Sequence, residues 1–201
     1  HKRPDAEPFF EEIELADHGV ALERVLALLT SAEYGVIDSV EELKEITEGS
    51  VIIRSHGVSR EIYHILEQRG VECIDATCPF VMKIQRIIDK HSTCDNIVLI
   101  AGDENHPEVK GFRSYCKGKS YVFRNYDELM QLIENNKLLS EIEVIYVART
   151  TFSINEYKKC SELIKKYCTN VKIFDTICDA TSKRQKDACN LSHKCDIIII
   201  I

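Results

Sequence analysis

Two segments of this chain are similar to each other, and each places a cysteine at the same point of its pattern. The first covers residues 72–86 and the second covers residues 172–186. In each segment a short apolar run ends at an aspartate, two residues follow, and a cysteine then precedes a stretch with helical spacing. These cysteines are Cys78 and Cys178. A strand that leads directly into a helix is the building block of α/β folds. The pattern therefore predicts α/β units whose thiols meet at one shared metal centre.

From residue 50 onward the chain continues to alternate β-rich and helical runs. This alternation predicts an α/β fold made of repeated small units with mostly parallel sheets. Ser59 and Ser153 are expected N-caps, Glu156 completes a capping box, and Gly70 ends a helix. Strands are expected at 50–54, 72–76, 96–101, 120–123, 143–148, 171–175 and 196–201. Helices are expected at 59–69, 80–91, 107–115, 127–135, 153–167 and 179–194, with helix-prone stretches at 9–14 and 18–32.

The composition narrows the class of protein. The 201 residues suffice for one or two domains, and 44% hydrophobic with 29% charged residues is typical of a soluble globular protein. The formal net charge of −7 argues against a general nucleic-acid binder, because such proteins are usually basic. No apolar run approaches the roughly 20 residues that cross a bilayer, and the first residues lack a signal-peptide core. We therefore expect a cytoplasmic protein with no nucleic-acid or membrane partner.

Seven of the nine cysteines divide into two kinds. None belongs to a C-x-x-C motif, which disfavours a zinc ribbon or a thioredoxin-like site. Cys78 and Cys178 stand at helix entries, where thiolate character is favoured and metals are bound. Two thiols are one or two ligands short of a complete site, so further ligands must come from elsewhere. Others lie in predicted strands or helices and are expected to be reduced, buried thiols. These are Cys73, Cys160, Cys168, Cys189 and Cys195.

Polar residues follow the predicted strands at the edge where parallel sheets form their sites. They are His56, His106, Glu108, Thr150 and Thr151. Imidazole and hydroxyl groups near helix N-termini suit an anionic, phosphate-bearing ligand. A glutamate held beside such a group can act as a general acid. Taken singly, each residue also has a structural explanation as a turn histidine, a capping threonine or a first-turn glutamate.

These residues belong to motifs that occur together in one order. The motifs are Ile53-Arg54-Ser55-His56-Gly57-Val58, Asp75-Ala76-Thr77-Cys78-Pro79, His106-Pro107-Glu108-Val109-Lys110-Gly111, Thr150-Thr151 and Thr176-Ile177-Cys178-Asp179-Ala180-Thr181. In this order and spacing they closely resemble the 4-hydroxy-3-methylbut-2-enyl diphosphate reductase family, also called LytB. The resemblance covers roughly residues 35–201.

The resemblance implies an activity and a cofactor. Members of the family reduce an allylic alcohol diphosphate to isopentenyl and dimethylallyl diphosphate, the last step of the non-mevalonate isoprenoid pathway. Three α/β units surround a 4Fe-4S cluster in pseudo-threefold arrangement, and Cys78 and Cys178 match two of the three cluster ligands. An electron donor such as ferredoxin, flavodoxin or a reduced flavin system is implied as a partner.

The resemblance also implies roles for the residues that bind the substrate. His56 and His106 match the histidines that bind the diphosphate. Glu108 matches the proton-delivering glutamate, and Thr150 matches the threonine beside it, with Thr151 next in the chain.

The chain departs from the family pattern in several places. Arg149 stands where the family usually has glutamine, and the family's first cysteine segment and its final Gly-Gly-x-x-Ser-Ser-Asn stretch have no match. We expect a helix-prone segment without a match (1–36), an incomplete first α/β unit (37–78), a second unit (79–177) and a truncated third unit (178–201). The main expectation is an iron–sulfur reductase. The alternatives are a non-catalytic α/β fragment of that family and an unrelated zinc- or phosphate-binding module.

Overall fold

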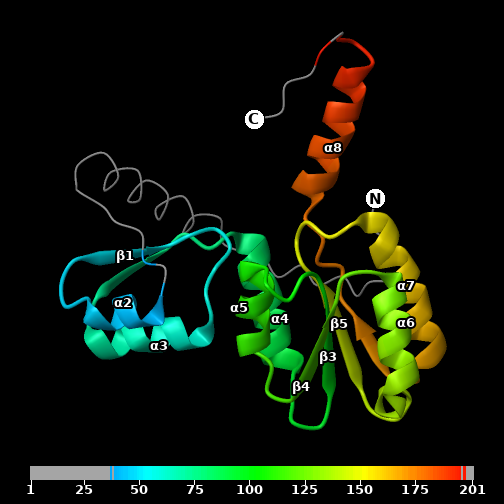
Figure 1. Cartoon of the computed structure of the whole chain (residues 1–201), viewed down its shortest axis with the longest axis horizontal. Helices are drawn as coiled ribbons and strands as arrows, with labels where there is room; N and C mark the ends of the chain where they lie inside the picture. The colour runs from blue at the N-terminus through cyan, green and yellow to red at the C-terminus, as the bar shows by residue number, and fades with distance from the viewer. Residues whose placement is uncertain (1–36, 38, 196, 198–201) are drawn as a thin grey trace.

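The computed structural model describes residues 37, 39–195 and 197, which form two parallel sheets with helices packed on them (Figure 1). The small sheet pairs β1 with β2, and the large sheet has the order β4-β3-β5-β6. The strands are β1 (Ser50–Ile53), β2 (Glu72–Asp75), β3 (Ile97–Ala101), β4 (Lys119–Phe123), β5 (Val144–Ala148) and β6 (Val171–Ile173). The helices are α2 (Val40–Glu45), α3 (Arg60–Arg69), α4 (Pro79–His91), α5 (Pro107–Ser114), α6 (Tyr126–Asn135), the 3-10 helix η1 (Lys137–Ser140), α7 (Ile154–Tyr167) and α8 (Asp179–Ser192). The expected α/β fold with parallel sheets is confirmed. None of the helices in this described part is long and apolar enough to cross a membrane.

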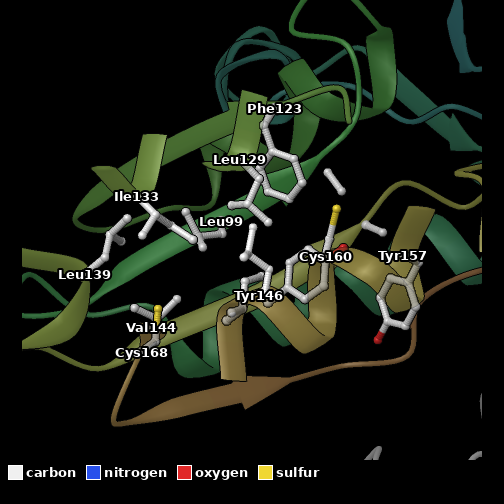
Figure 2. Packing of buried hydrophobic residues seen from close by; sticks show 14 of the residues in the cluster. Leu99, Phe123, Leu129, Ile133, Leu139, Val144, Tyr146, Tyr157, Cys160 and Cys168 are labelled. Carbon is white, nitrogen blue, oxygen red and sulfur yellow. The ribbon is translucent and has the colours of Figure 1, made fainter. Parts of the chain in front are cut away.

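The large sheet is covered on both faces. β3 and β5 lie at its centre and are buried along their whole length. Alternate residues of a strand point to opposite faces, so Val98 and Ile100 pack with α4 and α5 on one side. Leu99 and Tyr146 pack with α6 and α7 on the other side, as Figure 2 shows. Burial on both faces explains why these strands read as continuous apolar runs in the sequence.

The small sheet has a core of its own, built by α2, β1 and α3. Leu43, Ile53 and Leu66 are its most buried side chains. An isolated two-stranded sheet is marginally stable at best, so the apolar faces of these helices supply the partner that it needs.

Polar contacts of Arg60, at the start of α3, join the small sheet and its helices to the large one. Its backbone N–H donates to Ser114 Oγ at 2.9 Å, and its guanidinium donates to Asp89 at 2.5 Å. The guanidinium also lies 4.7 Å from the centre of the Tyr115 ring. The hydrogen bond from Arg60 lowers the pKa of Asp89, and the Lys117 ammonium adds to this effect. Because these pairs are half exposed, each adds little stability, but together they hold the start of α3 against the C-terminal end of α5.

The predicted elements agree with the observed ones within one or two residues, from the strand at 50–54 to the helix at 179–194. Sequence reasoning missed α2 and η1, because neither is long enough to show a periodic pattern. The expected strand at 196–201, apart from Ile197, and the helix-prone stretches at 9–14 and 18–32 lie outside the described residues.

β6 ends at Ile173, two residues before its predicted end. Thr176 explains the difference, because its hydroxyl accepts a hydrogen bond from Ala148 N at 2.9 Å and donates one to Ala148 O at 2.6 Å. A buried side chain thus replaces the backbone partner that a longer β6 would have offered. The chain between Ile173 and Cys178 leaves the sheet at this point.

The predicted helix caps are only partly correct. Gly70 ends α3 in the left-handed region with φ 64°, as expected. Ser153 Oγ accepts from Glu156 N at 3.4 Å, but the Glu156 carboxylate accepts from Tyr126 N at 3.0 Å, so only half of the capping box forms. Ser59 is at the N-cap of α3 without a capping hydrogen bond from its side chain.

The prediction of buried thiols is correct for Cys160 and Cys168 and wrong for Cys73, Cys189 and Cys195, which are exposed. Burial raises the pKa of Cys160 to about 12, which keeps that thiol protonated. Cys73 is exposed because it lies on an outer face of the narrow small sheet. Cys189 lies on α8, where none of the described side chains is buried.

We expect Leu99→Ala to lower the free energy of unfolding by about 2–5 kcal/mol, because it leaves a cavity in a fully buried strand. Leu138→Ala is the matched control, since Leu138 is 43% exposed and should change stability by less than about 0.5 kcal/mol. Urea unfolding followed by circular dichroism measures both. Equal losses in the two variants would contradict the burial of β3.

Candidate active site

Cys78 and Cys178 occupy equivalent positions. Each is half-buried and is the N-cap of the helix that follows it, α4 or α8. Cys78 N donates to Ser55 O at 2.9 Å, and Cys178 N donates to Thr150 O at 2.9 Å. Ser55 follows β1 and Thr150 follows β5, so each cysteine is tied to the segment after the neighbouring parallel strand. The repeat that was found in the sequence is therefore also a repeat of backbone geometry.

Glu108 and Thr150 form the most buried polar contact of the site. Glu108 lies in the first turn of α5, and it is 5% exposed while Thr150 is 6% exposed. The Thr150 backbone N–H donates to Glu108 Oε2 at 3.1 Å, and the Thr150 hydroxyl donates to Oε1 at 2.9 Å. Both residues follow central strands that are paired, β3 and β5, which explains why they meet although they are far apart in the sequence.

The two histidines come together from different sheets. His56 follows β1 of the small sheet and His106 follows β3 of the large one, yet their ring centres are 5.9 Å apart at an interplanar angle of 80°. His106 is the N-cap of α5, and its Nδ1 accepts from Glu108 N at 3.3 Å. A neutral imidazole that accepts at Nδ1 carries its proton on Nε2, so His106 has an N–H group left to donate.

Electrostatic effects favour this neutral form of His106. Burial lowers its pKa most, and the positive charge of Arg149 lowers it further. His56 acts in the same direction, whereas the carboxylates of Glu108 and Asp103 oppose the shift.

The turn that carries His56 requires a glycine. Gly57 has φ 68°, in the left-handed region that side chains with a Cβ disfavour. A Cβ at this position would also lie 2.9 Å from Gln85 Nε2 and 3.0 Å from Thr77 Cγ2. Close packing of the loop on α4 and on the end of β2 therefore fixes where His56 stands.

The contacts form a continuous row from one cysteine to the other. Cys78 is bonded to Ser55, the neighbour of His56, and the His56 ring meets that of His106. His106 caps the helix that carries Glu108. Glu108 accepts hydrogen bonds from Thr150, and the Thr150 carbonyl accepts one from Cys178. The row can bind an anion at its histidines and can hold a proton at its carboxyl group.

Thr151 does not join this row through a side-chain contact. It is exposed in the turn after β5, next to Thr150.

Sequence reasoning missed Gln85, which lies against Gly57 and Gly111 beneath the row. It is 4% exposed, and within the described residues its Nε2 has no hydrogen-bond partner. A polar residue on the apolar face of the predicted helix at 80–91 was the available signal.

The two thiols suit an iron–sulfur cluster in kind but do not complete a site. Thiolates are the usual ligands of such clusters, generally four to a cluster. Within the part of the chain that the structure describes, no three His, Cys, Asp or Glu side chains gather as metal ligands. Cys78 and Cys178 thus account for two ligands, and the described residues supply no third one close to either of them.

Comparisons with known proteins agree with the arrangement of these residues. The family model described as LytB protein matches residues 13–201. A 4-hydroxy-3-methylbut-2-enyl diphosphate reductase of Thermoanaerobacter sp. (strain X514) is 40% identical over 179 residues, which is 89% of this chain and 60% of that protein. The protein of the same name from Campylobacter hominis is 40% identical over 166 residues, which is 82% of this chain and 58% of the relative.

Solved structures give the same result. An (E)-4-hydroxy-3-methyl-but-2-enyl diphosphate reductase, the terminal enzyme of the non-mevalonate pathway, is similar with a TM-score of 0.63 and 28% identity over 90% of this chain and 70% of that one. The fold of E-1-hydroxy-2-methyl-but-2-enyl-4-diphosphate reductase from Plasmodium falciparum is similar with a TM-score of 0.71 and 21% identity, over 90% of this chain and 62% of that one.

The extent of these matches decides what they establish. The chain spans about 60% of the length of the curated relatives that it matches. The family model, in contrast, matches nearly the whole chain, including every residue of the row between the two cysteines. The chain therefore belongs to the LytB protein family.

Proposed function

We propose that this chain carries a large part of the active site of a 4-hydroxy-3-methylbut-2-enyl diphosphate reductase. Such an enzyme removes the hydroxyl group of an allylic alcohol diphosphate by reduction. The products, formed in the cytoplasm, are isopentenyl and dimethylallyl diphosphate. The observation that carries this proposal is the buried Glu108–Thr150 pair, which lies between paired histidines on one side and Cys178 on the other. The family and the names of the relatives support it.

The histidines are proposed to bind the diphosphate group. The N-terminus of α5 lies at His106 and directs backbone N–H groups and the positive end of the helix dipole outward. Nε2–H of His106 donates to a phosphate oxygen, and His56 approaches the same ligand from the small sheet. Thr151 is proposed to contact the substrate at the solvent-exposed edge of the site, because it is exposed and follows Thr150 in the chain.

Glu108 is proposed to hold the proton that leaves with the substrate hydroxyl as water. The carboxyl group is nearly buried, so bulk water does not compete for this proton. Thr150 fixes its orientation through two donors, a backbone N–H and a hydroxyl. A general acid held in this way contributes typically 10²–10⁴-fold to the rate.

Cys78 and Cys178 are proposed to hold a 4Fe-4S cluster together with further ligands. When bound, such a cluster supplies the electrons of the reduction and an iron that attracts the leaving oxygen. The electrons come from a donor such as ferredoxin, flavodoxin or a reduced flavin system.

The division of the chain into α/β units at residues 78 and 177 stays a prediction.

A second candidate is a non-catalytic α/β member of the family that cannot hold a complete cluster. The observation that favours it is that no group of three metal-ligating side chains occurs among the described residues. Anaerobic reconstitution of this chain with iron and sulfide, followed by turnover with dithionite as reductant, separates the two candidates. Turnover supports the reductase, and iron-free, inactive protein supports the second candidate.

We expect Glu108→Gln to lower turnover by about 10²–10⁴-fold with little change in KM, because the amide accepts from Thr150 but cannot release a proton to the substrate. Glu104→Gln is the matched control, since Glu104 is an exposed residue that pairs with Arg113. Steady-state assays of the reconstituted protein measure both variants. Equal turnover of Glu108→Gln and unchanged protein would exclude Glu108 as the acid.

We expect Cys78→Ser and Cys178→Ser each to lower the iron retained after reconstitution by at least about half, because a hydroxyl is a poor ligand for cluster iron. Cys73→Ser and Cys189→Ser are the controls. Cys73 and Cys189 lie near Cys78 and Cys178 in the sequence, and both are exposed free thiols. Iron content per chain, cluster absorbance and electron paramagnetic resonance give the readout. Equal iron in all four variants would place the cluster elsewhere.

A further inference from the structure

Arg149 lies at the edge of the site just described, directly after β5. Its backbone N–H donates to Ala101 O at 2.9 Å, which ties the start of this loop to the end of β3. Its side chain passes over Gly102, where an added Cβ would lie 3.4 Å from Arg149 Cδ. The side chain therefore extends over the segment that leads from β3 to His106.

The charge of Arg149 has no counterion among residues 39–195. Three other arginines of the described chain do pair with carboxylates: Arg60 with Asp89, Arg113 with Glu104 and Arg124 with Glu128. Among the side chains that the structure describes, none accepts a hydrogen bond from the half-buried Arg149 guanidinium. A planar group with five donors and no acceptor is ready to bind an anion from solution.

Asp103 is an acidic residue of the segment between β3 and His106, and its carboxylate already accepts a hydrogen bond. Its Oδ1 accepts from Asn105 N at 2.8 Å. The loop after β3 is thus held by its own hydrogen bond, and none of the ion pairs among the described residues joins Asp103 to Arg149.

The neighbouring His106 cannot supply the missing positive charge. Burial and Arg149 itself lower the pKa of His106, so the ring is neutral around pH 7. A neutral imidazole donates a hydrogen bond but does not balance a phosphate charge. The fixed charge at this edge of the site is that of Arg149.

We propose that Arg149 is an additional substrate-binding residue, whose guanidinium binds an anionic oxygen of the diphosphate alongside His106 and increases the selectivity for the charged end of the substrate. The proposal rests on the function proposed above. It goes beyond that function because the function proposed above assigns no residue with a permanent positive charge to the substrate. A ligand that lacks the negative charge should lose more affinity for the unchanged protein than for the Arg149→Gln variant.

Inorganic pyrophosphate is the probe, and isothermal titration calorimetry with this 201-residue chain measures its binding. We expect Arg149→Gln to weaken binding by about 10- to 100-fold, because a charge-assisted, bidentate contact is lost. Arg149→Lys should fall in between, since a lysine keeps the charge without the fork of donors. Arg113→Gln is the control for net charge and should stay within about twofold, because that arginine is exposed and paired with Glu104.

The pH dependence provides a readout that a purely structural role of Arg149 would not change. His106 faces His56, Glu108, Asp103 and Arg149, so the removal of Arg149 raises the pKa of His106. In Arg149→Gln, His106 therefore gains a proton at a higher pH than in the unchanged protein, and the imidazolium then partly replaces the lost charge. The difference in affinity between this variant and the unchanged protein should narrow as the pH falls, and NMR titration of His106 should show that its pKa is higher in the variant.

The outcomes separate the two proposals. If pyrophosphate binds, and binds more weakly to His106→Ala, but equally to Arg149→Gln, the inference on Arg149 is overturned and the diphosphate site stands. If the unchanged, folded protein does not bind pyrophosphate, both the proposed diphosphate site and the proposed role of Arg149 are wrong. A loss in Arg149→Gln that Arg149→Lys does not recover at all, accompanied by altered circular dichroism, would show a structural role and would also overturn the inference.

Discussion

β3 and β5 are paired in parallel from Ile97 and Val144 to Ala101 and Ala148, and the site depends on this register. Because both strands are buried on both faces, a shift along the ladder would expose apolar side chains of one strand or the other. The pairing brings the loops that follow the strands to one edge of the sheet. There a carboxylate from the first turn of α5, after β3, meets a hydroxyl from the segment after β5, although the rest of α5, β4, α6, η1 and β5 separate them in the chain.

The fold class could be predicted from the sequence because β3 and β5 are continuous apolar runs and the helices have one apolar face. The strand order β4-β3-β5-β6 could not be predicted in this way, since an alternation of strands and helices is compatible with several orders. The Glu108–Thr150 contact depends on that order, so the motifs suggested its members while only the structure shows their hydrogen bonds. The early end of β6 depends on a single buried hydroxyl, that of Thr176, which no periodicity reveals.

The cysteines show a similar difference between local and tertiary information. Helix entry at Cys78 and Cys178 is a local property, and it was predicted correctly from the spacing between strand and helix. Burial of a thiol is a tertiary property. Cys160 is buried because α7 packs on the large sheet, whereas Cys189 is exposed because it lies on α8, where none of the described side chains is buried. The same residue type in the same kind of helix therefore has opposite environments.

The polar contacts of Arg60 that connect the two sheets, called the joint below, have a thermodynamic consequence for ligand binding. His56 belongs to the small sheet and His106 to the large one, so a ligand that touches both rings binds only when the two sheets are held together. By linkage, the free energy by which the contact between the two sheets favours binding of the ligand equals the free energy by which the bound ligand stabilises that contact. The ion pairs of the joint are half exposed and are weakened by salt. Ionic strength therefore acts on affinity twice in this molecule, once by screening the anion and once by loosening the joint that positions its two imidazoles.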